Sequence, residues 1–219
     1  MKDKQYGELA EKYFEQARVI FSQPLVEQGD RGIALVNINL GIMSRRLGDL
    51  DEGLRRLEDG RDRLRKLGEM GYLAEALDEL GLVYMEMGKL RKAQDYLKES
   101  LQIALEYTDK YRFGSVVVDI CKVHYLNSDY PGLENCAATW EEKLLEWGIQ
   151  RYTYVWAKFN YLRGMGHWAA GHFLNGLRYL SAAAMAGFNA TQLRPSRITP
   201  WINTWRFWKV TISSRKNWR

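Results

Sequence analysis

The chain has 219 residues, of which 46% are hydrophobic, 27% are charged and only four are proline, a composition typical of a folded protein with a core. No segment approaches the ~20 uninterrupted apolar residues that span a bilayer. The charged start Met1–Gln5 lacks the apolar region of a signal peptide, so we expect a cytoplasmic protein. Two cysteines, Cys121 and Cys136, are too few for a zinc site or a disulfide framework.

Charge is divided unevenly along the chain. Residues 1–146 carry 21 basic and 27 acidic side chains, whereas residues 147–219 carry eleven basic side chains and no acidic one. All eight tryptophans lie at or after Trp140. Such asymmetry favours a docking surface for an acidic partner.

The first predicted helix spans about residues 5–22, where apolar side chains recur every three or four positions. Gln23-Pro24 follows it, as after a helix end. The pattern is that of the second helix of a hairpin whose first helix is missing. Residues 1–29 therefore form either a cap or part of a longer array, and the unpaired helix offers a route to self-association.

Eight further helices are predicted, at about 30–47, 50–67, 72–87, 90–107, 111–127, 131–147, 151–170 and 172–187. They belong to a repeat with a spacing of 40, in which small residues coincide (Gly41, Gly81 and Cys121) and turn residues coincide (Gly48, Gly88 and Ser128). Each unit is a helical hairpin that buries its apolar face only by stacking on its neighbours. A fourth unit, at a spacing of 43, is predicted from Gly164, Gly171, Phe173, Gly176 and Leu180, with Arg163 where leucine is expected.

This pattern resembles the tetratricopeptide repeat, and the second unit matches it best, with Leu80, Gly81, Tyr84, Gly88, Leu90, Ala93 and Leu97. The period exceeds the usual ~34 residues and resembles the longer variety of MalT-like regulators, kinesin light chains and signal-transduction ATPases. The resemblance covers residues 30–190. It implies an all-α fold, a right-handed α-solenoid of about four antiparallel helix hairpins, followed by a basic, Trp-rich segment at 191–219.

The resemblance also implies where a partner binds, in a concave groove lined by the first helix of each hairpin. In this sequence the groove positions are Leu35, Ile38, Ile42, Arg45, Glu75, Asp78, Leu82, Met85, Ser115, Val118, Lys122, Tyr125, Lys158, Tyr161 and Trp168. Their mixture of apolar anchors and charges suits a peptide or an amphipathic helix. For any one of them, packing against the next helix is the competing interpretation, most of all for Ile38, Leu82 and Val118.

Signatures of catalysis are missing from the sequence. It contains no phosphate-binding G-x-x-x-x-G-K-[ST] loop, no G-x-S-x-G and no H-E-x-x-H. His167 and His172 are five residues apart, which suits no common metal site, and pairs such as Glu141-Glu142 read as charged helix faces. We therefore expect no enzyme activity, no cofactor and no metal.

The predicted function is that of a protein–protein interaction scaffold or sensor module, as part of a bacterial signalling or transcriptional regulator. The alternative is nucleic-acid binding by the segment 191–219, where Arg and Lys meet phosphates and Trp stacks on bases. Contact with anionic lipid and the start of a further element are the other interpretations of that segment.

Overall fold

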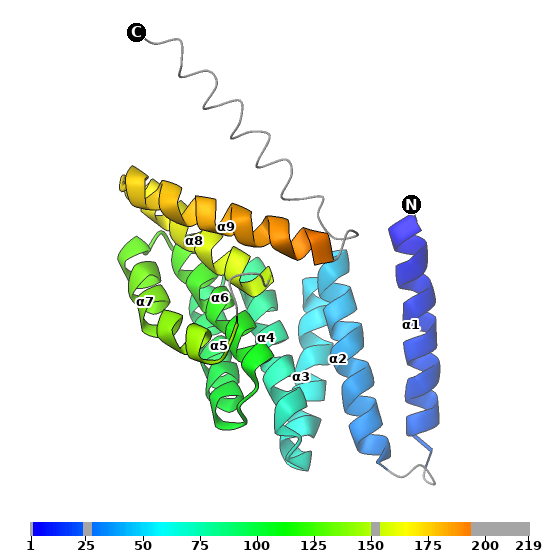
Figure 1. Ribbon diagram of the computed structural model, residues 1–219. Helices are drawn as coiled ribbons and strands as arrows, with labels where there is room; N and C mark the ends of the chain where they lie inside the picture. The colour runs from blue at the N-terminus through cyan, green and yellow to red at the C-terminus, as the bar shows by residue number, and fades with distance from the viewer. Residues whose placement is uncertain (1, 24–27, 150–153, 194–219) are drawn as a thin grey trace. The chain divides into compact units, whose positions relative to one another are not determined.

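The computed structural model describes the backbone of residues 2–23, 28–149 and 154–193, and the side chains of residues 9–23, 28–149 and 154–186. Within these ranges the chain is helical and contains no strand. It forms two compact units, Met1–Asn127 and Ser128–Arg219. Figure 1 labels the helices of the chain. The division falls inside the repeat domain expected at 30–190, so the predicted domain boundaries stay predictions, and the segment from residue 194 lies outside the described residues.

The first unit holds six helices: α1 (Lys2–Phe21), α2 (Gly29–Leu47), α3 (Leu50–Leu67), α4 (Met70–Glu86), α5 (Leu90–Glu106) and α6 (Lys110–Leu126). The second unit holds α7 (Tyr130–Glu146), α8 (Tyr154–Ala169) and α9 (Phe173–Leu193). Hairpins form from α2 and α3, from α4 and α5, and from α8 and α9, while α1 packs on α2. The described helices therefore follow the sequence prediction closely, with most boundaries within one or two residues.

Left-handed turn residues lie between the described helices, and all of them except Gly171 fall on two registers with a spacing of 40. Gly48, Gly88 and Ser128 belong to one register, and Gln28, Gly68, Thr108 and Gly148 belong to the other. At Gly48 the amide of the turn residue bonds the carbonyl of Arg45 and the next amide bonds Ser44, which satisfies the carbonyls at the helix end. The sequence pattern revealed the first register only, because the second alternates glycine with Gln28 and Thr108.

Small residues set the distance between the helices of each hairpin. A Cβ added to Gly41 would lie 2.6 Å from Leu57 Cγ, and one added to Gly81 would lie 2.7 Å from Leu97 Cγ. In the second unit, a Cβ on Gly164 would lie 2.8 Å from Leu180 Cγ. Because the same close approach recurs in α8 and α9, the structure supports the register that the sequence indicated for the fourth unit.

The core of the first unit is a continuous layer of apolar side chains between the hairpins. Leu57, Leu64, Leu77 and Leu80 are completely buried in it. These residues come from α3, the second helix of one hairpin, and from α4, the first helix of the next, so neither hairpin could bury them alone. The outward-facing side chains of the first helices are thereby held on a fixed scaffold.

Candidate partner-binding surface

The first helices of the hairpins lie next to one another in the first unit, where α4 contacts both α2 and α6. Eight of the predicted groove residues are partly exposed there, and six of them recur at two positions shared by all three helices: Leu35, Ile42, Glu75, Leu82, Ser115 and Lys122. We call this set the α2–α4–α6 face. Three of its members are apolar, and the charged ones lie on α4 and α6.

Four predicted groove residues are buried instead. Ile38, Asp78 and Val118 are each 3% exposed, and Met85 is 4% exposed. The reason is helix geometry. Ile38 lies three residues after Leu35, and a step of three along this helix turns the side chain toward the core. A step of four or seven residues from Leu35 keeps the side chain outward. These four side chains support the face from below, and a partner contact by any of them would require movement.

Sequence reasoning missed four polar residues of the same helices. Asn39 and Arg46 on α2, and Glu79 and Glu86 on α4, occupy the outward positions that the predicted set skipped. The signal that could have found them is the helical period itself, counted in steps of four and seven from Leu35 and Glu75. The repeat positions carried over by resemblance included inward ones in their place.

Ion pairs cross between the first helices and fix their spacing. Arg45 of α2 lies 3.0 Å from Glu79 and also pairs with Glu86, both on α4. Arg112 of α6 lies 3.2 Å from Asp78 and 3.5 Å from Glu75, both on α4. Helix α4 thus presents four carboxylates to two guanidinium groups, and its centre has an excess of acidic side chains.

Asp78 is the most perturbed acid of this region. Its side chain is 4% exposed, and burial raises the pKa of its carboxyl, as does the nearby charge of Asp119, while Arg112 opposes the rise. The Oδ1 atom of Asp78 is buried without a hydrogen-bond partner among the described residues. Protonation of this carboxyl relieves the repulsion between two buried acids.

The remaining predicted groove residues are spread over both units. Arg45 and Tyr125 are partly exposed in the first unit, and Lys158 and Tyr161 are partly exposed in the second. Trp168 is 37% exposed and packs edge-on against Phe173, with ring centroids 5.1 Å apart. Because the two units are described separately, a single surface that includes all fifteen residues stays a prediction.

Arg163 stands where the repeat pattern has leucine, and its ionic contacts explain why an arginine fits there. It is 6% exposed, at the position where Leu40 and Leu80 fill the core of the first unit. Its Nε lies 2.8 Å from Glu134 and its Nη1 lies 2.7 Å from Glu141, both on α7. The guanidinium also stacks over the ring of Tyr179 on α9, 4.3 Å from the centroid. An ionic network therefore joins α7, α8 and α9 where an apolar contact was expected.

The electrostatics of this network favour its charged form. Burial alone would lower the pKa of the Arg163 guanidinium, but hydrogen bonds to Glu134 and Glu141 raise it. Burial would raise the pKa of the Glu134 carboxyl, yet Arg163 and His167 lower it. His167 Nε2 lies 3.1 Å from Glu134, and its ring stacks on Tyr179. The histidine thus has a structural partner.

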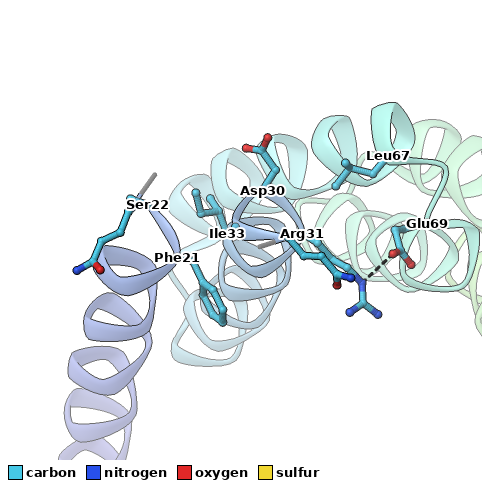
Figure 2. A pocket seen from close by; sticks show the side chains of 10 residues that line it. Phe21, Ser22, Asp30, Arg31, Ile33, Leu67 and Glu69 are labelled. Atoms are coloured by element: carbon cyan, nitrogen blue, oxygen red, sulfur yellow. Dashed lines mark ion pairs between the residues drawn. The ribbon is translucent and has the colours of Figure 1, made fainter. Parts of the chain in front are cut away.

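A pocket of about 620 Å³ opens where the α1–α2 and α3–α4 turns meet in the first unit (Figure 2). Phe21, Ile33 and Leu67 supply its apolar lining. Its charged residues are already engaged, since Arg31 Nε lies 2.7 Å from Glu69 and Asp30 pairs with Arg63 at 3.2 Å. This lining gives no specific indication of a ligand.

No three or more His, Cys, Asp or Glu side chains among the described residues gather in a way that could hold a metal ion. None of the helices in the described ranges is long and apolar enough to cross a membrane. The cytoplasmic location stays a prediction.

Comparison with solved structures places the fold among helical-repeat proteins. BtubC (BKLC) from P. vanneervenii has a TM-score of 0.71 at 16% identity, covering 84% of this chain and 74% of that one. A putative kinesin light chain from Podosopora anserina, with nearly identical TPR-like repeats, has a TM-score of 0.65 at 13% identity, covering 89% and 91%. The all-α solenoid class is thereby confirmed.

A third similar structure was solved with a peptide bound. The Rap conjugation gene regulator of the plasmid pLS20, in complex with the Phr* peptide, has a TM-score of 0.65 at 13% identity. The match covers 94% of this chain and 58% of the regulator. At such identities the likeness concerns the fold alone. No curated protein sequence matches the chain significantly.

A sequence match identifies the repeats of the first two hairpins. Residues 31–106, which span the hairpins α2–α3 and α4–α5, match the family model of the tetratricopeptide repeat. Residues 31–106 therefore form tetratricopeptide repeats, and the period of 40 and the kinesin-light-chain-like neighbours are in keeping with the longer kind of that repeat.

Proposed function

We propose that this protein is a non-enzymatic interaction module whose α2–α4–α6 face binds a peptide or a helix of another protein. The observation that carries the proposal is the pattern of that face, on which the partly exposed apolar side chains Leu35, Ile42 and Leu82 accompany the carboxylates of α4. Apolar anchors beside charged groups suit a segment with an apolar side.

The preorganised backbone supports the same proposal. Arg45 and Arg112 tie α4 to both of its neighbours, and the side chains of these arginines are only 13% and 16% exposed. A surface fixed in this way loses little conformational entropy when it binds. The Rap regulator, a protein of similar fold, binds the Phr* peptide, which is in keeping with a peptide partner for this chain. A role in bacterial signalling is a further part of the proposal.

A photo-crosslinking amino acid at position 82 tests the proposal. Leu82 lies on the proposed face, and Lys98, exposed on α5, provides the matched control position. We expect one specific polypeptide to be captured from the native cell at position 82 and not at position 98. Equal capture at the two positions, or none at position 82, would contradict the proposal.

The affinity for the captured polypeptide then measures the apolar contribution of Leu82. Replacing Leu82 by Ala removes a partly buried apolar contact and should weaken binding about ten-fold, or ~1.4 kcal/mol. Lys98→Ala should leave this affinity unchanged.

Nucleic-acid binding, the alternative from the sequence, depends mostly on residues outside the described ranges, and no described residue favours it.

A further inference from the structure

One side of α9 presents large apolar side chains to solvent. Leu174 and Met185 are 84% and 69% exposed. Together with Arg178 and Ser181, which are also exposed, they recur at steps of four, three and four residues, which places all four on one side of the helix. We call these four residues the α9 stripe. Phe173, the first residue of the helix, is 56% exposed as well.

The repeat register shows that this is the solvent side of a second helix. Leu180 of α9 is equivalent to Leu57 of α3, because each of them meets a glycine of the first helix at the close approach described above. Counted from these two residues, the α9 stripe corresponds to charged or polar positions on α3 and α5, all of them exposed or partly exposed. On α3 they are Asp51, Arg55, Glu58 and Asp62, and on α5 they are Arg91, Asp95, Lys98 and Gln102. Among the described residues, the packing of one repeat on the next therefore leaves this side of a second helix open.

The α9 stripe departs from its equivalents in being apolar. Leu174 and Met185 stand where α3 has Asp51 and Asp62. Single apolar residues are common on protein surfaces, but these two share one side of a helix that also exposes Phe173. Since no repeat packs on this side in α3 or α5, the apolar residues indicate a contact outside the repeat fold.

Charge indicates that this contact is anionic. Helix α9 contains no acidic residue, whereas α3 contains five and α5 contains three. Residues 147–219 carry eleven basic side chains and no acidic one. A negatively charged surface that approaches α9 therefore meets attraction without opposing repulsion, and Arg178 supplies a cation within the stripe itself.

Among anionic surfaces, lipid fits the α9 stripe better than nucleic acid or an acidic polypeptide. Leu174 and Met185 offer no charge or hydrogen bond to a phosphate backbone, and they have no ring on which a base could stack. The side of a helix is convex, so it offers no groove to a polypeptide. Apolar side chains beside basic ones on one helix side are the pattern of segments that lie in the interface of a bilayer.

We propose that the α9 stripe attaches this protein reversibly to an anionic membrane surface. The helix lies in the plane of the surface, with Leu174 and Met185 inserted below the headgroups. The long side chain of Arg178 reaches back to the lipid phosphates. Insertion of two apolar side chains and attraction by basic groups add to each other, and neither gives firm attachment alone. The contact uses no residue of the α2–α4–α6 face, so it does not depend on the proposed function.

Flotation of the full chain with lipid vesicles tests the inference. The chain should float with vesicles of phosphatidylcholine and phosphatidylserine, and much less with phosphatidylcholine alone or at high salt. Leu174→Ser with Met185→Ser should lower the partition coefficient about ten-fold, because the inserted groups are lost while every charge is kept. The matched control is Tyr111→Ser, since Tyr111 is a 76% exposed residue on α6 of the first unit, and it should leave flotation unchanged.

An environment-sensitive fluorescent amino acid reports insertion directly. In place of Leu174, its emission should shift to the blue when anionic vesicles are added, because the side chain enters an apolar medium. In place of Asp51, the equivalent residue of α3, its emission should not shift. Circular dichroism confirms that each variant remains helical.

Several results overturn the inference. They are a chain that does not float, one that floats equally well with neutral vesicles, and one whose flotation survives the Leu174 and Met185 substitutions. Emission from position 174 that is already blue before vesicles are added also overturns it, because another part of the chain or a second copy then covers the α9 stripe. Binding to single-stranded nucleic acid without binding to vesicles has the same consequence.

Discussion

Replacement of Gly41 by Ala tests whether the small residues of the repeat exist to bring two helices together. In the structure the added Cβ would lie 2.6 Å from Leu57 Cγ and 3.1 Å from the carbonyl oxygen of Gly53. Leu57 is completely buried and its Cγ is the branch point of the side chain, so neither neighbour can move without shifting α3.

Two terms of opposite sign decide the size of the effect. Overpacking a core costs ~1–3 kcal/mol, and Gly to Ala inside a helix returns up to ~1 kcal/mol. Because one of the two close contacts is with backbone, the packing cost should dominate, and we expect the free energy of unfolding to fall by about 1–2 kcal/mol.

Gly71→Ala is the matched control, since Gly71 lies in α4 and a Cβ there meets nothing within 4 Å. It should leave stability unchanged or raise it by up to ~1 kcal/mol. Urea denaturation followed by circular dichroism measures both variants. Equal changes of the same sign in the two variants would refute the close-packing argument.

Four further substitutions have defined outcomes. Thr108 is β-branched and has a φ of 55°, so Thr108→Gly should raise the melting temperature with a gain of ~0.5–1 kcal/mol, whereas Gly88→Ala at an equivalent turn should lower it. Burial and the charge of Asp119 raise the pKa of the Asp78 carboxyl, so the folded state keeps this proton to a higher pH than the unfolded state does. The contribution of Asp78 to the free energy of unfolding therefore falls as the pH rises from ~4 through the folded-state pKa. Asp78→Asn should flatten that decline in melting curves measured over a series of pH values. Arg163→Ala leaves Glu134 and Glu141 facing each other, and should destabilise the second unit by ~3 kcal/mol, seen as earlier unfolding of the Trp fluorescence.

Much of the fold was predictable because its signals are local and repeat. Apolar spacing and turn residues located the described helices, and Gly41 and Gly81 marked the close approach within hairpins. The fourth unit was recognisable despite Arg163, whose burial could not be foreseen because it depends on Glu134 and Glu141 from another helix. A long-range ionic network leaves no periodic trace in the sequence.

The candidate surface was predictable only in part. Leu35, Ile42 and Leu82 are partly exposed, whereas Ile38 and Val118 are buried, because each of these two lies three residues after a partly exposed position and so turns toward the core. The pairing of Arg45 with Glu79 joins residues 34 apart in the sequence, and only packing of α2 on α4 brings them together. The apolar spacing of α1 was visible in the sequence, but the exposure of Leu9, Tyr13 and Ile20 required the structure.

The most direct measurement of the central claim is a methyl nuclear magnetic resonance titration of the chain with the polypeptide captured at position 82. If that polypeptide lies on the α2–α4–α6 face, the methyl signals of Leu35, Ile42 and Leu82 should shift, while that of Leu67, exposed at the end of α3, should not. Shifts confined to methyl groups of α3 and α5, with Leu35, Ile42 and Leu82 unchanged, would contradict the account.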